Sequence, residues 1–281
     1  MIYELNKADY EKVRPLFQAL EYHLTSAAVL DGNCPGKVFV DDPANPQTAF
    51  VFSPEGCYLA GNPTNDAFNR ALNNAIYAGE AFDEEVDALF FVYHPEGWRE
   101  HLPVVLDPRP PIKMHRRHYV CRELKYDWRA NVPDGYVVHH INEPLLNRPG
   151  LRIPDHVTNW MENNWGSAAD FLQRGFGFVA IHTDEVASWS LADCISGDGC
   201  EIGIHTLPAY RRRGLATITA AAAMDHAFSR GLSLIGWQCA EDNLGSIRTA
   251  EKAGFEKERD YTMYYMFLDE AAHLAERGDE K

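Results

Sequence analysis

The sequence predicts a mixed α+β or α/β protein built from two parts, because short apolar segments alternate with helical segments along the 281-residue chain. The apolar segments end at proline, glycine or aspartate, as β-strands do. The helical segments repeat apolar residues with the period of an α-helix. Residues 106–112 contain three prolines and Pro103 stands just before them, which is typical of a connector. We therefore expect a smaller α/β N-terminal domain over residues 1–110 and a second domain over residues 111–281.

The N-terminal domain is predicted to begin with a helix over residues 6–24, where apolar residues recur at helical spacing and Asn6 with Asp9 resembles a capping pair. A second helix is predicted over residues 68–77. The predicted strands of this domain are 37–40, 48–52, 57–60 and 88–93. The domain carries no chemical motif, and no internal repeat or low-complexity tract is evident in the chain.

The second domain is predicted to contain more strands, with helices between the later ones. The predicted strands are 118–124, 136–141, 176–182, 186–191, 201–206, 234–240 and a last one near 261–268. The predicted helices are 157–173, 217–228 and 246–253. Gly231 and Gly254 follow the last two helices, as C-terminal capping glycines do. This order indicates a sheet covered by helices.

The composition excludes several classes of protein. A formal net charge of −15 argues against a general nucleic-acid binder, which needs a basic surface. The charge fits a cationic small substrate, and solubility alone also explains it. Six scattered cysteines without a C-x-x-C pair, and no apolar N-terminal segment, indicate reduced thiols in a cytoplasm. No run reaches the ~18 apolar residues of a membrane span, and no Asp, Cys and His cluster has metal-ligand spacing.

One stretch indicates an anion-binding site. The apolar strand from Glu201 is followed by a turn with Pro208 and then by Arg211–Ala216, which opens an alanine-rich helix. Such a helix start presents unpaired backbone N–H groups, and the helix dipole adds roughly half a positive charge. Glycine lets the backbone come close to a phosphate, so the segment suits a pyrophosphate held mainly by main-chain groups. The alternative is an ordinary solvated turn.

Two motifs follow one another in the second domain, R-x-x-G-x-A after one strand and N-x-x-S with an E-K-x-G-F ending after the next. Their residues are Arg211, Gly214, Ala216, Asn243, Ser246 and the segment 251–255. This combination resembles the GNAT superfamily of acetyl-CoA-dependent N-acetyltransferases, over residues 117–270. The segments 201–206 and 237–239 are similar to its zwittermicin-resistance-type branch. The resemblance implies a GNAT fold, which is a mixed, largely antiparallel central sheet flanked by helices, preceded here by an extra domain.

The resemblance also implies that acetyl-CoA is the acyl donor. Family members hold the pantetheine arm between two strands that splay apart, which here correspond to residues 204–206 and 237–239. The backbone of residues 212–217 would wrap the pyrophosphate, and arginine side chains would add charge-assisted contacts. The alternative for the first strand is ordinary apolar packing. The residues expected to bind acetyl-CoA are Ile204, His205, Thr206, Arg211, Arg212, Arg213, Gly214, Leu215, Ala216, Thr217, Asn243 and Ser246.

Acetyl transfer to an amine needs a proton acceptor, because a primary ammonium with a pKa near ~10 is mostly charged at pH 7. Glu201 is the first candidate, since a glutamate at the start of this strand serves as general base in the histone-acetyltransferase branch. The alternative is an ion pair with an arginine at a strand end. His205 is the second candidate, and otherwise an ordinary strand histidine. About 13 Å separates the two positions, so both reach one amine only through a bulge or a water chain.

The usual general acid is missing from its place. The superfamily often protonates the leaving thiolate with a tyrosine seven residues after the asparagine of N-x-x-S, and that position is Ala250 here. Tyr264 is our candidate substitute, with Tyr261 and Tyr265 beside it on the last predicted strand. The alternative is that these aromatic residues belong to the core. A thiolate also leaves tolerably well without a proton donor.

The function implied is a cytoplasmic N-acetyltransferase that moves acetyl from acetyl-CoA to a primary amine of a small molecule, by direct attack in a ternary complex. The alternative is a non-catalytic module that binds acyl-CoA as a sensor or scaffold, which the missing tyrosine at position 250 keeps open. The partner expected is a small-molecule amine, with neither nucleic acid nor membrane. Both a monomer and a homodimer are compatible with the sequence.

Overall fold

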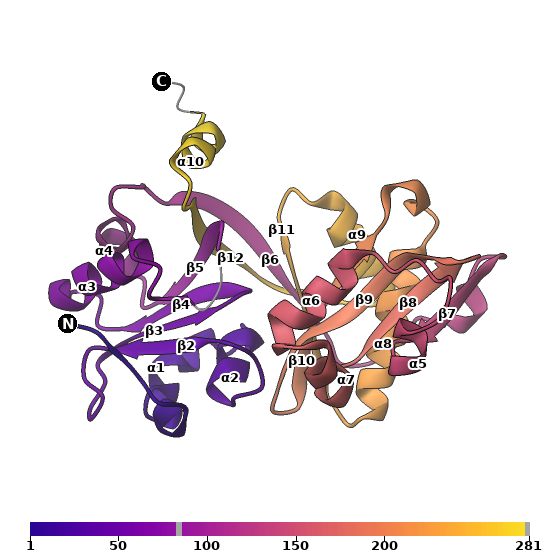
Figure 1. The fold of residues 1–281 in the computed structure, drawn as a ribbon, viewed down its shortest axis with the longest axis horizontal. Helices are drawn as coiled ribbons and strands as arrows, with labels where there is room; N and C mark the ends of the chain where they lie inside the picture. Colours follow the sequence, from indigo (N-terminus) through magenta and orange to yellow (C-terminus); the bar gives the residue numbers. More distant parts are fainter. Residues whose placement is uncertain (83–85, 279–281) are drawn as a thin grey trace. The chain divides into compact units, whose positions relative to one another are not determined.

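The computed structural model describes residues 1–82 and 86–278 (Figure 1). It divides the chain into two compact units. Unit 1 holds residues 1–115 and 262–281, and unit 2 holds residues 116–261. The first boundary lies close to the connector, whereas the end of the chain groups with the N-terminal unit instead of the second domain. The reason is the strand β12 (Glu256–Phe267), whose residues Tyr264–Phe267 pair with β5 (Ala88–His94).

Unit 1 is a sheet in the order β1-β2-β3-β4-β5-β12. Its neighbouring strands are antiparallel except for β4 and β5, which run parallel. The four strands before β5 are β1 (Tyr3–Glu4), β2 (Lys37–Val40), β3 (Thr48–Ser53) and β4 (Gly56–Gly61). Phe50, Leu72 and Phe91 are fully buried in its core. The predicted strands of the N-terminal part are therefore confirmed.

The helices of unit 1 differ from prediction at the N-terminus. The expected single helix over 6–24 is wrong, because Pro15 lacks the N–H that a continuous helix needs. That segment instead forms the 3₁₀ turns η1 (Lys7–Lys12) and η2 (Gln18–Leu20) around the short α1 (Arg14–Phe17). The remaining helices are α2 (Leu24–Leu30), α3 (Asp66–Tyr77), α4 (Trp98–Val105) and α10 (Glu270–Arg277).

Unit 2 contains a sheet in the order β6-β11-β10-β9-β8-β7. All neighbours are antiparallel except β10 and β11, which run parallel. The strands are β6 (Ile112–Cys121), β7 (Tyr136–His140), β8 (Gly177–His182), β9 (Glu185–Ser196), β10 (Gly199–Thr206) and β11 (Leu234–Ala240). A mixed, largely antiparallel sheet was predicted, and the structure confirms it.

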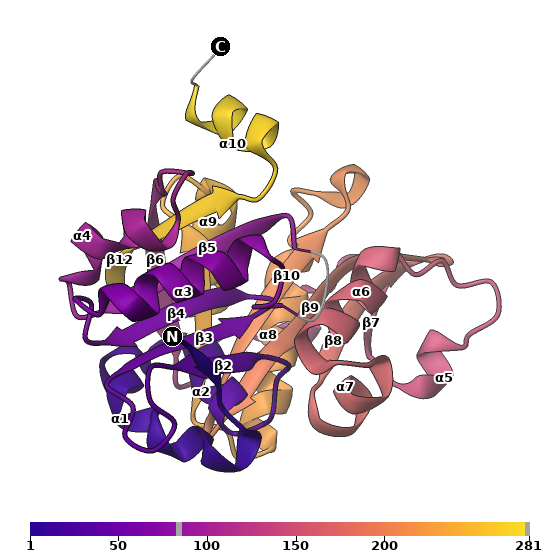
Figure 2. The same cartoon turned by 60° about the vertical axis from the view of Figure 1, so that its left-hand side comes forward.

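Helices cover both faces of this sheet. The helix α8 (Leu215–Ser229) packs on β8, β9 and β10, while α6 (Asp155–Trp165) and α7 (Ala168–Arg174) lie on the other face (Figures 1 and 2). The predicted helix 157–173 is broken into α6 and α7, because Gly166 ends the first in a left-handed conformation (φ 82°) and Ser167 caps the second. The other elements are η3 (Arg129–Asn131), α5 (Glu143–Leu146), η4 (Pro208–Tyr210) and α9 (Leu244–Ala253).

The two units repeat one topology that the sequence does not reveal. In each unit a parallel strand pair is linked by a crossover helix and followed by a second helix, as β4-α3-β5-α4 in unit 1 and β10-α8-β11-α9 in unit 2. The strand that follows this second helix pairs in the other unit. β6 follows α4 of unit 1 and pairs with β11 of unit 2, and β12 follows α9 of unit 2 and pairs with β5 of unit 1. The chain is therefore a tandem of two related halves.

Across residues 1–82 and 86–278, no helix has both the length and the apolar character needed to cross a membrane.

Candidate acetyl-CoA site

The site is a cavity of about 590 Å³ beside the open ends of β10 and the N-termini of α8 and α9. The strands β10 and β11 pair only at Gly199–Glu201, opposite Leu234–Gly236, and then continue without pairing to each other. The expected splayed strands are thus present. The predicted cofactor residues that line the cavity are Ile204, His205, Thr206, Arg211, Arg212, Gly214, Leu215, Ala216, Thr217, Asn243 and Ser246.

The loop before α8 presents free backbone donors to this cavity. Arg212 (φ 62°) and Gly214 (φ 83°) both have left-handed backbone conformations. The first helical hydrogen bond runs from the N–H of Ile218 to the carbonyl of Gly214. No acceptor within the described part of the chain meets the N–H groups of residues 212–217. A helix start with these donors and the helix dipole is suited to a phosphate.

Gly214 is required for a reason that the sequence did not show. We expected that a side chain there would obstruct a phosphate. In the structure a Cβ at Gly214 would meet no protein atom within 4 Å, whereas its φ of 83° is one that other residues rarely adopt. The glycine therefore sets the turn that aims the N–H groups, and it also leaves the space in front of them open.

The structure places Arg213 outside the cavity, although the sequence grouped it with the cofactor residues. Its guanidinium donates to the hydroxyl of Tyr136 (2.8 Å) and to the carbonyl of Ala209 (3.3 Å). Tyr136 also packs edge-on against Tyr210, whose hydroxyl donates to Glu185 (2.6 Å). Arg213 thus fastens the loop to β7 and η4, while Arg211 and Arg212 remain on the cavity side.

The start of α9 forms another part of the cavity wall. The Asn243 side chain caps this helix by accepting from the N–H of Ser246 (3.0 Å). The Ser246 hydroxyl in turn accepts from the indole N–H of Trp237 on β11 (3.0 Å). Through these contacts Asn243 and Ser246 stabilise the start of α9 and its packing against β11 at the cavity wall. Ala250, at the position of the usual tyrosine acid, is fully buried in the core of unit 2.

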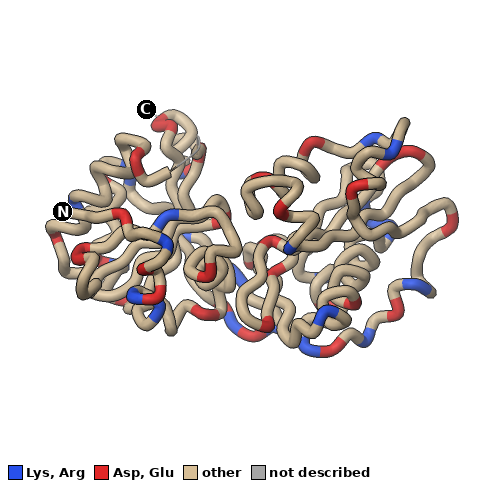
Figure 3. The backbone as a smooth tube through the Cα atoms, turned by 60° about the horizontal axis from the view of Figure 1, so that its bottom comes forward, with Lys and Arg blue, Asp and Glu red and all other residues tan. Residues whose placement is uncertain are grey.

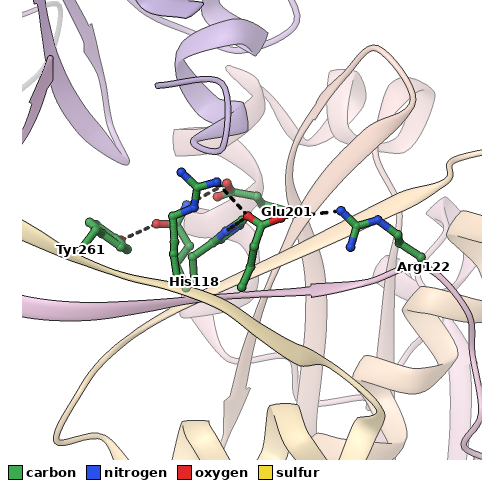
Figure 4. Close-up of polar contacts among 7 residues, drawn as sticks. His118, Arg122, Glu201 and Tyr261 are labelled. Carbon is green, nitrogen blue, oxygen red and sulfur yellow. Dashed lines mark hydrogen bonds and ion pairs between the residues drawn. The ribbon is translucent and has the colours of Figure 1, made fainter. Parts of the chain in front are cut away.

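Glu201 lies at the point where β10 and β11 separate, and it is buried. It is not among the residues that line the cavity. Its carboxylate accepts from the Gln238 side-chain amide (2.7 Å), and the Tyr261 hydroxyl donates to the carbonyl oxygen of that amide (Figure 4). Tyr261 on β12, Gln238 on β11 and Glu201 on β10 therefore form a continuous hydrogen-bonded chain.

A buried histidine completes the surroundings of Glu201. A Cβ built on Gly236 would lie 3.0 Å from Cγ of Glu201 and 3.5 Å from Nε2 of His118, so this glycine leaves room for both side chains. His118 Nδ1 lies 3.1 Å from Glu258, which also pairs with Arg122 (Figure 4). Burial lowers the pKa of His118 despite the attraction of Glu258.

His205 lines the cavity and packs in a cluster of rings. Its imidazole stacks on Trp189 (4.7 Å between centroids) and lies 4.9 Å from His156. Burial lowers its pKa, with further lowering from His156 and Arg211. A register shift does occur beside Glu201, but the extra residue is Asp193 on β9, because Glu201 faces Cys194 and Ile202 faces Ala192. The spacing between Glu201 and His205 along β10 is thus that of an ordinary strand.

The three candidate tyrosines lie in different settings. Tyr264 belongs to unit 1, where it pairs opposite Phe91 and stacks on Tyr93 (5.8 Å). Tyr265 donates to Glu276 (2.7 Å), and burial with this contact raises its pKa to about 12. Of the three, Tyr261 lies in unit 2 and is connected to Glu201 through Gln238.

Sequence reasoning missed several residues of the site. Arg248 and Thr249 of α9 line the cavity, together with Tyr210 and Gly245. Arg248 and Thr249 follow Gly245 by three and four residues, so helical spacing could have placed them on the same face as this residue of the first turn. Gln238 lies inside the quoted segment 237–239, and strand alternation from Gly236 could have directed it toward Glu201. Among the described residues no group of His, Cys, Asp and Glu is suited to hold a metal.

Gly203→Ala should destabilise the protein by about 1–3 kcal/mol, the usual cost of overpacking a tight site. A methyl group at Gly203 would overlap the ring of Trp160 and approach Asp193, and the indole N–H of Trp160 is already fixed by donating to Asp193 (2.7 Å). Urea denaturation measures the change. Gly245→Ala is the matched control, since its nearest neighbour is an Asn243 oxygen at 3.6 Å. Equal stability of the two variants would contradict this packing.

A parallel strand pair that opens beside a basic helix start with free N–H groups is suited to an extended ligand that carries a phosphate. Comparison with known proteins identifies the family. The chain belongs to the GNAT acetyltransferase family, whose model matches residues 14–264, and it is therefore an acyltransferase. It is 26% identical over 267 residues to the uncharacterized N-acetyltransferase YdfB of Bacillus subtilis (strain 168), covering 94% of this chain and 98% of that protein.

Solved structures show the same fold. A GCN5-related N-acetyltransferase-like protein from Streptococcus suis matches with a TM-score of 0.68 at 22% identity, over 92% of this chain and 98% of that one. A tandem GNAT protein from the clavulanic acid biosynthesis pathway matches with a TM-score of 0.54 at 13% identity, over 96% and 98%. Both matches span the two units, which agrees with the repeated topology described above.

Proposed function

We propose that the protein transfers acetyl from acetyl-CoA to a primary amine of a small molecule, by direct attack in a ternary complex. The observation that carries the proposal is the cavity, which is lined both by the loop with free N–H groups before α8 and by the end of β10, where β10 no longer pairs with β11. The first feature suits the pyrophosphate of a CoA thioester. The second offers unpaired strand backbone to an extended pantetheine arm.

The order of residues along β10 favours Glu201 over His205 as the base. The proposed pyrophosphate site follows Thr206 in the chain, so the arm would run from Thr206 past Ile204 toward the point where the strands join. The thioester, at the far end of the arm, would then lie near Glu201, whereas His205 would lie beside the arm. An amine attacking there would pass its proton to the carboxylate, directly or through a water.

The structure gives less support for any one residue as the proton donor to the departing thiolate than it gives for Glu201 as the base. Tyr261 is connected to Glu201 through Gln238 and lies in the same unit, which supports it over Tyr264. Tyr264 and Tyr265 remain predictions from the sequence. Five of the six cysteines are buried and none of the six forms a disulfide, which supports the proposal of a cytoplasmic protein.

The chain should bind one acetyl-CoA, because unit 1 lacks the features that make the site in unit 2. Its strands β4 and β5 stay paired from Cys57 to Ala60, so they do not splay. Its loop between β4 and α3 has no Arg or Lys, and Asn65 caps α3 by accepting from the N–H of Phe68 (3.1 Å). Isothermal titration should give a stoichiometry near one. A stoichiometry of two would contradict this difference, and no binding would contradict the proposed function.

A further inference from the structure

Three arginines face the cavity without an acidic partner. Arg211 and Arg212 precede α8, and Arg248 lies on α9. All three are exposed, and no carboxylate among the described residues pairs with any of them. Arg211 donates to the carbonyl of Thr206 (3.2 Å), which leaves its remaining donors available. Three such guanidinium groups around one cavity form a strongly positive site.

This positive site is unusual for the chain. The protein has 41 acidic and 26 basic residues, and Asp and Glu are spread over both units (Figure 3). Two other exposed arginines of unit 2 do have acidic partners: Arg152 pairs with Asp184 (2.9 Å) and Arg129 with Asp225 (2.8 Å). In an acidic protein, unpaired arginines gathered at a cavity indicate that an anionic ligand supplies the missing charge.

The arginines lie on two separate elements, and the α8 side already has its own donors for a pyrophosphate. The free N–H groups of residues 212–217 and the helix dipole serve one diphosphate group. A CoA thioester carries a second, separate phosphate on the 3′ position of its ribose. On the α9 side the cavity offers Arg248 beside Ser246 and Thr249, and a guanidinium is well matched to a phosphate dianion.

We propose that Arg248 binds the 3′-phosphate of the CoA donor and thereby selects CoA thioesters over those that lack this phosphate. This inference rests on the proposed function, because it assumes that the cavity holds a CoA thioester. Arg248 is a binding and specificity residue in this account, remote from the reacting atoms, so its replacement should change donor affinity and leave the chemistry at Glu201 unaltered.

The test compares two ligands on matched variants by isothermal titration. The ligands are CoA and dephospho-CoA, which differ only in the 3′-phosphate. Arg248→Ala should weaken CoA binding about tenfold, as loss of a charge-assisted hydrogen bond does, and dephospho-CoA binding by less than about twofold. Arg248→Lys should lose less CoA affinity than Arg248→Ala, because it keeps the charge without the planar fork.

Arg148→Ala is the control, since Arg148 is an exposed arginine of unit 2 that does not line the cavity. It removes the same charge and should leave both affinities within about twofold. Equal weakening of CoA and dephospho-CoA by Arg248→Ala, or no weakening of either, would overturn the assignment to the 3′-phosphate. Failure of the unaltered protein to bind either ligand would instead contradict the proposed function.

Discussion

Gly214→Glu should abolish measurable acetyl-CoA binding. The substitution places a carboxylate in front of the free N–H groups of residues 212–217, where the proposed pyrophosphate lies. Like charges repel there, and the carboxylate can itself accept from the same donors. The backbone adds strain, because a non-glycine residue held at φ 83° costs of order 1–3 kcal/mol. Isothermal titration measures the loss.

Gly214→Asn separates the two causes. Asparagine tolerates the left-handed conformation better than other side chains and carries no charge. It should fold like the unaltered protein and retain part of the affinity, with unfolding midpoints measured for both variants. Acetyl-CoA binding that survives unchanged in a folded Gly214→Glu variant would rule out this loop as the donor site.

Glu201→Gln should lower kcat about 100-fold or more, because an amide cannot accept the proton that the attacking amine must lose. The substitution is nearly isosteric, and Glu201 does not line the cavity, so the dissociation constant for acetyl-CoA should stay nearly the same. Steady-state kinetics with a competent amine, together with titration of the donor, gives both quantities. This pattern of reduced kcat with intact donor binding is the signature of a base.

His205→Gln is the comparison for this variant, since His205 was the second candidate base. His205 lies in the cavity beside the proposed pantetheine path, with a pKa lowered by burial. Its replacement should affect donor affinity more than kcat. A loss in kcat below about threefold for Glu201→Gln, with a larger loss for His205→Gln, would transfer the role of base to His205.

The residues that line the cavity were largely predictable because their signals are local. The strand 201–206, the loop at Arg211–Ala216 and the Asn243 cap act through backbone geometry within a few residues, which the sequence displays directly. The direction of each arginine was not predictable. Arg211, Arg212 and Arg213 are consecutive, yet Arg213 turns to Tyr136, a residue 77 positions away on β7.

The remaining differences come from long-range or backbone effects. The predicted helix 157–173 is split because Gly166 adopts a left-handed conformation. The helical spacing of apolar residues continues past this glycine, so it does not indicate the break. The return of β12 to unit 1 is a pairing between residues near 265 and residues near 90, which no local pattern encodes. The repeated topology is likewise absent from the sequence pattern. The two units have the same order of paired strands and helices, but different residues form them.

The surroundings of Glu201 show the same limit of prediction. Glu201 was predicted from the resemblance and its place at the start of the strand, whereas Gln238 contacts it from β11, Tyr261 on β12 reaches it through Gln238, and His118 lies near it on β6. Only the assembled sheet brings these groups together, and Gly236 makes room for them by having no side chain.

The most direct test of the central claim is amine-dependent release of CoA. The purified protein is incubated with acetyl-CoA and a panel of small primary amines, and both free CoA and the acetylated amine are followed by mass spectrometry. We expect at least one amine to give equal amounts of CoA and acetylated product, and Glu201→Gln to suppress both. Saturable acetyl-CoA binding without amine-dependent release across the panel would contradict the proposed transfer and favour a non-catalytic acyl-CoA-binding module.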